Sequence, residues 1–203
     1  MALVKYNNNS ISAVTAAASI PSGSLVLIKS QTASSSANIS FIHGTSSVVF
    51  DGTYNTYMFK FIDIHPASAE HFTFNATTDG TNFNVTKTTT YFHATHNEGG
   101  SSQSLSYVTG KDLAQSTDYQ RIIDSMSNAN DECGSGTLFF FSPASTTFVK
   151  HFISNTSSAN AEEKNAYVAG YMNTTSAITG IDFKMSSGNI DSGTIKLYGI
   201  KDS

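Results

Sequence analysis

The chain has 203 residues, a formal net charge of −4 with neutral histidines, and only 13% charged residues. The acidic balance and the single arginine argue against nucleic-acid binding, which rests on clustered Lys and Arg. The single cysteine excludes an internal disulfide and a multi-cysteine zinc site. This length suits one all-β domain that buries a core without disulfides or metals.

The N-terminal stretch has small and apolar runs, but the asparagines at 7–9 interrupt them. No basic region precedes an apolar run of signal-peptide length, and no run reaches the ~20 residues that cross a bilayer. We therefore expect synthesis in the cytoplasm without cleavage or membrane insertion. We expect residues 1–20 to form an extended arm and residues 21–203 a single β-sandwich domain. The arm offers four candidate contact residues, Val4, Ile11, Val14 and Ile20, which suit a segment that orders on a neighbour.

Segments of alternating polarity then follow one another, as in strands with one buried face. Residues 22–30 place Leu25 and Leu27 on one face and apolar residues on the other, which predicts a strand covered on both sides or paired at an interface. Further strands are expected within 37–44 and 53–66. Within 70–94, Asp79 and Gly80 lie between two alternating segments and predict a hairpin.

The middle of the chain has a different pattern. Residues 95–105 indicate an exposed loop, and residues 118–126 carry an apolar stripe at helical spacing. A short helix is predicted there, with a bulged strand as the alternative. Strands follow within 136–143, 146–154 and 165–173, and the last strands, within 181–198, are predicted to form a closing hairpin. The pattern predicts an all-β fold, a jelly-roll-like antiparallel β-sandwich with at most one short helix.

Few residues point to chemistry. His93, His96 and Glu98 are weak candidate contact residues, but positions 93 and 96 point to opposite faces if the segment is a strand. An incidental polar segment is therefore favoured over a metal site, and a turn is favoured over a calcium loop at residues 128–133. We assign no catalytic residue, metal or cofactor and expect no enzymatic activity. Paired acids for glycoside cleavage remain open, because their meeting is spatial.

Aromatic residues are abundant, with 14 Phe, nine Tyr and no Trp. They predict a core built from Phe, with tyrosines at surfaces where the ring packs and the hydroxyl meets water. Half-buried tyrosines are the plainer interpretation, and a contact surface for protein or sugar is the sharper one. The tyrosines concerned are Tyr6, Tyr54, Tyr57, Tyr107, Tyr119 and Tyr171.

Several phrases resemble a known group of proteins. They are the opening residues 7–42, "TYNTYMFKFIDIHPAS" at 53–68, "STTFVKHFISNTSS" at 145–158, and residues 169–200. The chain resembles small virion-associated proteins of marine tailed bacteriophages, especially those of cyanobacteria. The resemblance spans nearly the full length and implies a β-sandwich displayed on the virion without enzymatic activity. It carries over no binding residue.

The resemblance leaves two functional hypotheses. The first is a capsid decoration or cement protein, made in the host cytoplasm, that contacts other virion proteins and uses residues 2–20 as an adhesive arm. The second is a receptor- or glycan-binding module of a tail fibre or head appendage, in which residues 95–105 contact a host glycan. The absence of a shaft or anchoring domain favours decoration. A virion presents repeated lattice points, so a homo-oligomer is expected, with a trimer as the first hypothesis.

Overall fold

The computed structural model describes residues 24–201 of the chain. These residues form two antiparallel sheets and no helix, which confirms the predicted all-β sandwich. Between residues 24 and 201 there is accordingly no helix long and apolar enough to cross a membrane.

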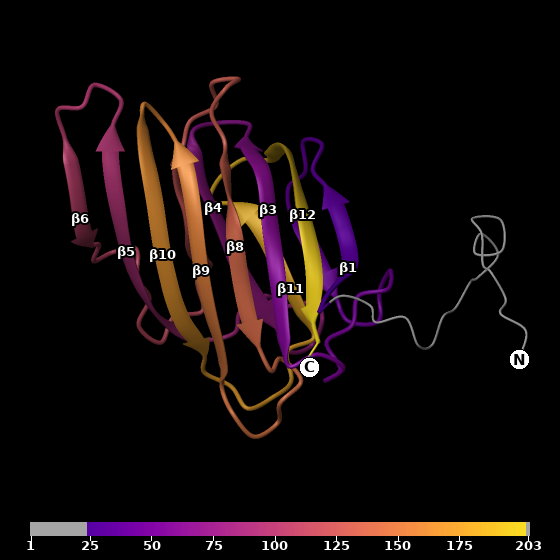
Figure 1. The fold of residues 1–203 in the computed structure, drawn as a ribbon. Helices are drawn as coiled ribbons and strands as arrows, with labels where there is room; N and C mark the ends of the chain where they lie inside the picture. The colour runs from indigo at the N-terminus through magenta and orange to yellow at the C-terminus, as the bar shows by residue number, and fades with distance from the viewer. Residues whose placement is uncertain (1–23, 202–203) are drawn as a thin grey trace, which may run out of the picture.

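The large sheet has eight strands in the order β1-β12-β3-β8-β9-β10-β5-β6. Its strands are β1 (Leu25–Thr32), β12 (Ile190–Ile200), β3 (Thr56–Pro66), β8 (Gly134–Phe141), β9 (Lys150–Ala159), β10 (Glu162–Met172), β5 (Lys87–Asn97) and β6 (Gln103–Tyr107). Figure 1 shows them side by side from β6 to β1. The first and last strands of the described chain, β1 and β12, are therefore neighbours at one edge.

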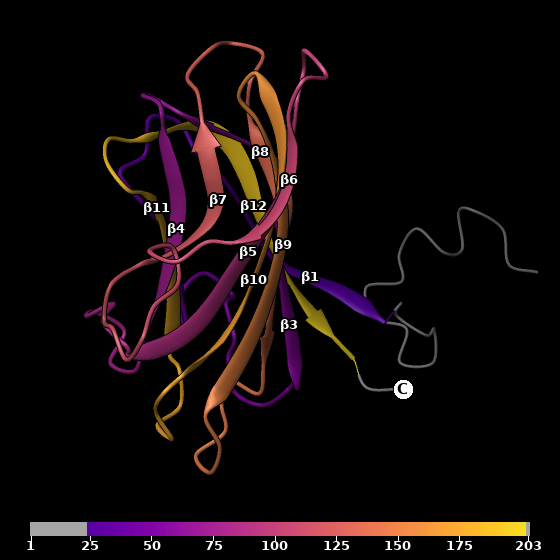
Figure 2. The ribbon, with the colours of Figure 1, turned by 90° about the vertical axis from the view of Figure 1, so that its left-hand side faces the viewer.

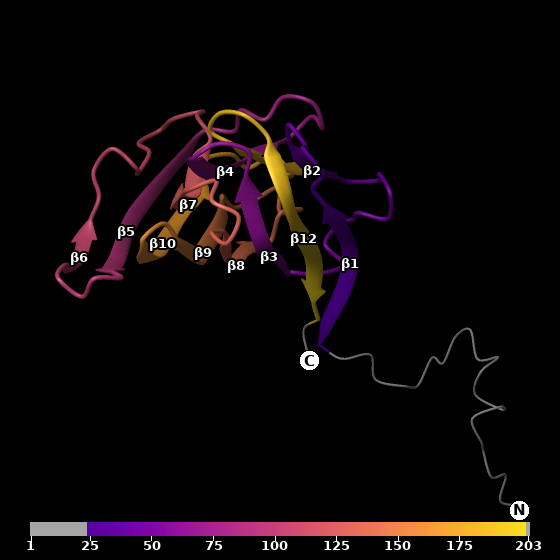
Figure 3. The same ribbon diagram turned by 90° about the horizontal axis from the view of Figure 1, so that it is seen from above.

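The small sheet has four strands in the order β2-β11-β4-β7. They are β2 (Ile39–Ile42), β11 (Gly180–Met185), β4 (Glu70–Thr77) and β7 (Gln120–Met126). Figure 2 shows the small sheet as a second layer on one face of the large sheet, and Figure 3 shows both from above. The other face of the large sheet, here called the outer face, has no sheet packed on it among the described residues.

The strand order is that of a jelly roll with two additions. The core strands β1-β12-β3-β8 and β2-β11-β4-β7 form two four-stranded sheets between which the chain repeatedly crosses. The β5–β6 and β9–β10 hairpins are inserted into this pattern, and both extend the large sheet beyond β8. The additions make the large sheet twice as wide as the small one.

The core between the sheets is built largely from phenylalanine. Phe183 of β11 lies at its centre, with its ring 5.0 Å from that of Phe59 and 5.3 Å from that of Phe61, measured between centroids. Both contacts are edge-to-face, the geometry that the ring quadrupole favours. Phe41, Phe72 and Phe74 complete the cluster, and all six rings are buried. The predicted Phe core is confirmed.

The predicted closing hairpin is wrong. The two segments are strands, β11 and β12, but β11 pairs with β2 and β4 in the small sheet, whereas β12 pairs with β1 and β3 in the large sheet. The turn residues at 186–189 carry the chain from one layer to the other. Turn residues between two alternating segments indicate a reversal, but they do not show that the segments pair with each other.

The hairpin predicted at Asp79 and Gly80 fails for the same reason. A turn is present, with Gly80 at a φ of 79° and the Asp79 carboxylate accepting the N–H groups of Thr81 and Asn82. The chain beyond it forms no strand until β5, which belongs to the large sheet. In contrast, residues 95–105, expected as a loop, contain the ends of β5 and β6 joined by a short turn.

The predicted helix at 118–126 is also wrong, because this segment contains strand β7. Its pairing with β4 shifts register twice, between Glu70 and Phe72 and between Phe72 and Thr73. In the second shift Phe72 pairs with Ile123 and Thr73 with Arg121, which makes Ile122 an extra residue and leaves both isoleucines buried. Consecutive buried residues break the period of two and imitate a helical stripe, so the bulged-strand alternative is the correct one.

Candidate functional site

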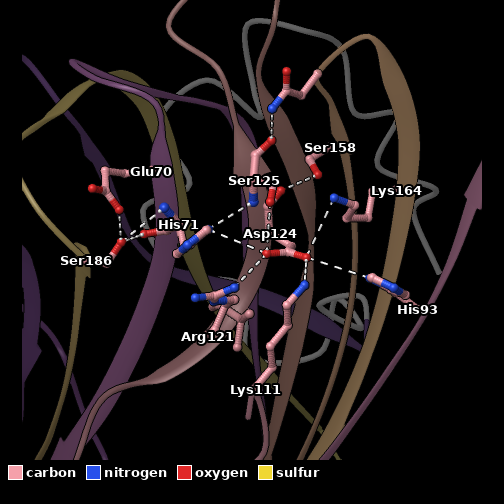
Figure 4. A network of polar contacts seen from close by, with 12 residues as sticks. Glu70, His71, His93, Lys111, Arg121, Asp124, Ser125, Ser158, Lys164 and Ser186 are labelled. Atoms are coloured by element: carbon pink, nitrogen blue, oxygen red, sulfur yellow. Dashed lines mark hydrogen bonds and ion pairs between the residues drawn. The ribbon is translucent and has the colours of Figure 1, made fainter. Parts of the chain in front are cut away.

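Asp124 of β7 is the most densely paired charged group that the structure describes. Its side chain is fully buried, and its two carboxylate oxygens meet Lys111, Arg121 and Lys164. Lys111 donates a hydrogen bond from Nζ to Oδ2, and Arg121 donates one from Nη1 to Oδ1 at 2.9 Å. Lys164 Nζ lies 3.8 Å from Oδ2 and also pairs with Glu162 at 2.8 Å. Figure 4 shows the three cations converging on one carboxylate.

Two histidines complete what we call the Asp124 cluster (His71, His93, Lys111, Arg121, Asp124 and Lys164). Nδ1 of His71 lies 3.5 Å from Asp124 Oδ1, and Nδ1 of His93 lies 3.7 Å from Oδ2. His71 Nδ1 accepts the backbone N–H of Ser125 at 3.1 Å, which requires that nitrogen to be unprotonated. His93 Nδ1 is buried and has no hydrogen-bond partner among the described residues.

The cluster joins the two sheets. Its members come from β4 and β7 of the small sheet, from β5 and β10 of the large sheet, and from the segment that leads from β6 to β7. β7 is the strand of the small sheet that packs on β9 and β10. The ion pairs therefore lie where the edge of the small sheet meets the added half of the large sheet.

The surrounding charges keep Asp124 ionised. Burial alone would raise the pKa of its carboxyl, but the hydrogen bond and charge of Lys111, with the charges of Lys164 and Arg121, lower the pKa to about 2. Burial lowers the pKa of both histidines, helped by Arg121 at His71 and by Lys111 at His93. Near neutral pH both histidines are therefore uncharged. The Asp124 carboxylate beside them is ionised and paired with the charges of its lysine and arginine neighbours.

Hydroxyl and amide side chains of the β9 region bind the free edge of β7 at the same place. Thr156 donates to the carbonyl of Ile122 at 2.5 Å, and Ser158 donates to the carbonyl of Asp124 at 2.7 Å. Asn160 donates to the carbonyl of Ser125 at 2.8 Å. These bonds satisfy carbonyls that a strand at the edge of a sheet leaves open. The ion pairs of Asp124 and these hydrogen bonds together hold β7 against the large sheet. The arrangement therefore supports a structural role for the cluster.

The outer face of the large sheet presents a different surface. On its central strands, side chains alternate between buried residues under the small sheet and residues that point outward. One outward row runs across seven strands and is almost entirely apolar. In order from β1 to β5 it consists of Leu27, Tyr198, Met58, Phe139, Ile153, Ala169 and Thr90, each paired in register with the next.

The adjacent outward row divides into two halves. From β1 it begins with Ser30, Lys196, Lys60, Thr137 and Asn155 and ends with Tyr167, Phe92 and Tyr107. The rings of Phe92 and Tyr167 stack with centroids 5.0 Å apart and planes inclined by 8°. We call the first row from Leu27 to Ala169, together with Phe92, Tyr107 and Tyr167, the apolar band.

Several members of the apolar band are open to solvent. Ile153 and Leu27 are each 52% exposed, and Phe92 and Tyr167 are 40% and 41% exposed. Two shallow hollows adjoin Ile153 and Ala169, one of about 450 Å³ towards Tyr171 and one of about 160 Å³ towards Phe92. A continuous apolar row with adjoining hollows is typical of a protein contact surface.

The structure separates the three polar residues that the sequence singled out. His93 points inward to the Asp124 cluster, whereas His96 lies exposed on the same strand, as the alternation along β5 predicted. Glu98 is exposed in the turn after β5, where its backbone N–H donates to the carbonyl of Ala161. Among residues 24–201 no group of three His, Cys, Asp or Glu side chains could hold a metal ion.

The remaining predicted contact residues have mixed outcomes. The four positions of the predicted arm, Val4, Ile11, Val14 and Ile20, lie outside the described residues. Tyr107 is exposed on the outer face as expected. The prediction that Tyr57 lies at the surface is wrong, because its side chain is fully buried. Leu25 and Leu27 lie exposed at one end of the outer face, so this strand is not covered on both sides by the described residues, and the interface alternative stays a prediction.

A separate polar hollow, of about 390 Å³, includes residues 130–133 of the segment for which a turn was predicted in preference to a calcium loop. It is lined by Asp63, His65, Asn130, Asp131, Glu132, Cys133, Asp191 and Ser192. The segment does form a turn, in which the N–H of Glu132 bonds to the carbonyl of Ala129. Cys133 is a free thiol whose pKa is raised by burial and by Asp63.

Sequence reasoning missed the Asp124 cluster and the full extent of the apolar band. The six members of the cluster are spread over more than 90 residues of the chain, and only register brings them together. The single arginine of the sequence was a usable signal, because it lies in the cluster. Comparison with models of protein families, with curated proteins and with solved structures gives no match for this chain.

Proposed function

We propose that this chain is a non-enzymatic structural protein of a bacteriophage virion, a decoration or cement protein attached to the capsid surface. The observation that carries the proposal is the apolar band, because it indicates that the chain works within a larger protein assembly. An apolar row that crosses seven of the eight strands of a sheet face suits permanent contact with protein more than contact with a small polar ligand. The jelly-roll topology agrees with it, since capsid domains are among the folds that use this architecture.

The distribution of polar groups supports a structural role. The ion pairs of the Asp124 cluster lie inside the molecule, where they and the neighbouring hydroxyl groups hold β7 against β9 and β10. A β-sandwich held in this way is rigid and presents the outer face of the large sheet as one broad surface. In this proposal the chain is made in the host cytoplasm and then contacts other virion proteins.

The copy number in purified particles tests the proposal. Quantitative mass spectrometry should find the chain at tens to hundreds of copies per particle, in a fixed ratio to the major capsid protein. Stripping the protein should lower the temperature at which particles release DNA, and adding it back should restore that temperature. A few copies per particle, or none, would contradict a decoration role.

A receptor- or glycan-binding module is the second candidate, and one observation favours it. Tyr107, Phe92 and Tyr167 form an exposed aromatic row on adjacent strands, with the amide of Asn155 next in line. Sugar rings stack on such side chains while amides bind hydroxyl groups. Glycan-array binding that is lost in Phe92→Ala, with a few copies at the tail, would favour this function over decoration.

A further inference from the structure

We infer that the apolar band joins two copies of this chain, outer face to outer face, around a two-fold axis that runs along the strands between β8 and β9. The inference deepens the proposed function by naming one partner of the virion module. It rests on that function for its biological setting only, because the contact itself is a property of the chain. The two halves of the outer face match each other in side-chain size and in charge, as the contacts below show.

The centre of the apolar band is suited to self-contact. β8 and β9 are the fourth and fifth of eight strands, and Phe139 of β8 is paired in register with Ile153 of β9. A two-fold axis between these strands brings Phe139 of each copy over Ile153 of the other. A single pair of residues therefore provides two apolar contacts at the centre of the interface, as an isologous contact requires.

Large side chains on one half of the band fall opposite small ones on the other. The same axis brings β3 over β10 and β12 over β5, which sets Met58 against Ala169 and Tyr198 against Thr90. Ala169 lines both shallow hollows, so the face is hollowed where the longer Met58 side chain would arrive. Interlocking of large and small residues is the usual way in which two sheet faces pack.

The neighbouring row shows a second match, in charge. Its first half carries Lys60 and Lys196, and its second half carries the stacked rings of Tyr167 and Phe92. The axis sets Lys60 over Tyr167 and Lys196 over Phe92, so that ammonium groups meet aromatic faces. An unrelated partner would not require one half of the surface to complement the other, and this is why we assign the face to a second copy.

The size of the face is sufficient for a stable pair. Eight strands at ~4.8 Å spacing cover about 38 Å, and three outward rows at ~6.7 Å intervals cover about 20 Å. The third row lies beside the apolar one, on the side away from Lys60, and consists of Leu25, Ile200, Thr56, Phe141, His151, Tyr171 and Thr88. Such a footprint of about 760 Å² on each copy gives about 1,500 Å² in total, within the range of specific interfaces. Beyond it the outward residues of β8 to β10 are Ser135, Ser157 and Asn165, which form a polar rim.

Light scattering on the full chain after size exclusion tests the contact. The native chain should have twice the mass of one chain at micromolar concentration. Ile153→Lys places a charge at the centre twice per pair and should weaken association at least ~100-fold, as for a central hot spot. Phe148→Lys is the matched control, since Phe148 is 72% exposed but lies in the loop before β9. It should leave the mass unchanged.

A charge swap tests the assigned contact directly. Ile153→Lys and Phe139→Glu should each be monomeric alone, because each places two charges against apolar side chains. Mixed together they should form a heterodimer, because Lys at 153 meets Glu at 139 while the second central contact remains native. Far-UV circular dichroism and thermal melting of each variant would establish that both are folded.

Several results would overturn the inference. They are a native monomer at several hundred micromolar, a trimer, a pair that Ile153→Lys leaves intact, or a pair that is lost only when residues 1–23 are removed. The decoration role and this contact can fail independently of each other. A pair in solution on a chain that is absent from the shell would contradict decoration alone, and an abundant shell protein that stays monomeric in solution and on the particle would contradict this contact alone.

Discussion

The two halves of the large sheet use the same geometry with different chemistry beneath the small sheet. Under β3 and β8 the buried side chains are apolar, such as Phe59, Phe61 and Leu138, and the rings of Phe59 and Phe61 pack on Phe183. Under β9 and β10 the inward residues include Thr156, Ser158 and Lys164, which bind β7 and Asp124. The jelly-roll half is held by packing, whereas the added half combines packing, as of Phe152 against Phe74, with hydrogen bonds and ion pairs.

The difference teaches where specificity resides in this fold. Apolar packing is non-directional and tolerates shifts of register, whereas paired charges and hydroxyls require one placement. β7 has one paired edge and an irregular register with β4. The polar clasp therefore fixes the strand that apolar packing would leave least defined. Four predictions test this division, in order of the expected loss of stability.

Phe183→Ala should cause the largest loss, about 4 kcal/mol in the free energy of unfolding, because it leaves a cavity at the centre of the Phe cluster. Urea unfolding followed by circular dichroism measures it, since the chain has no Trp for fluorescence. Phe148→Ala, at an exposed position, is the control and should have little effect. A loss below about 1 kcal/mol for Phe183→Ala would contradict the claim that apolar packing stabilises the jelly-roll half.

Asp124→Asn should cost about 3 kcal/mol, because it leaves Lys111, Arg121 and Lys164 without their buried counter-charge. The matched control is Asp131→Asn, at an exposed position in the turn before β8, and it should leave the free energy of unfolding nearly unchanged. If the two variants unfold at the same urea concentration, the ion pairs of Asp124 do not stabilise the contact between the two sheets.

Thr156→Val should cost about 1–2 kcal/mol, because the shape is kept while the buried carbonyl of Ile122 loses its donor. Ser157→Ala, the next residue on the opposite face, serves as the comparison. Hydrogen exchange should speed up at β7 amides in the Thr156 variant and remain unchanged in the Ser157 variant. Equal protection in both would show that the edge of β7 needs no such bond.

The histidines should give the smallest effect, seen as a dependence on pH. The pKa values of His71 and His93 are lowered in the folded chain, so the unfolded chain takes up protons first as pH falls below ~6.5. Stability is then full above that pH and declines towards pH 5. His93→Gln should flatten this decline, and His96→Gln, on the exposed side of β5, should not. Identical slopes for both variants would contradict the assigned burial.

Much of the fold could be predicted from alternation, but the pairing could not. The period of two located segments that became β3, β8 and β12, because each has one apolar face under the small sheet. Alternation reports which face is buried and not which layer a strand joins. For this reason β11 and β12 were taken as partners although they belong to different sheets.

The candidate sites were harder to predict for physical reasons. In β9, Ser154 and Thr156 point inward while Asn155 and Ser157 point outward, so both faces are polar and parity carries no signal. His93 was named, yet its partners Lys111, Asp124 and Lys164 come from three other segments. Leu27 and Tyr107 were the members of the apolar band that the sequence singled out, Leu27 because its strand is apolar on both faces and Tyr107 as a tyrosine expected at a surface.

Cryo-electron microscopy of intact particles tests the central claim most directly. The account predicts density for this chain repeated over the shell, in pairs whose large sheets meet at the apolar band. Ile153 would then lie covered in each copy. Isolated copies at the tail or a vertex, with the apolar band facing solvent, would contradict both the decoration role and the paired arrangement.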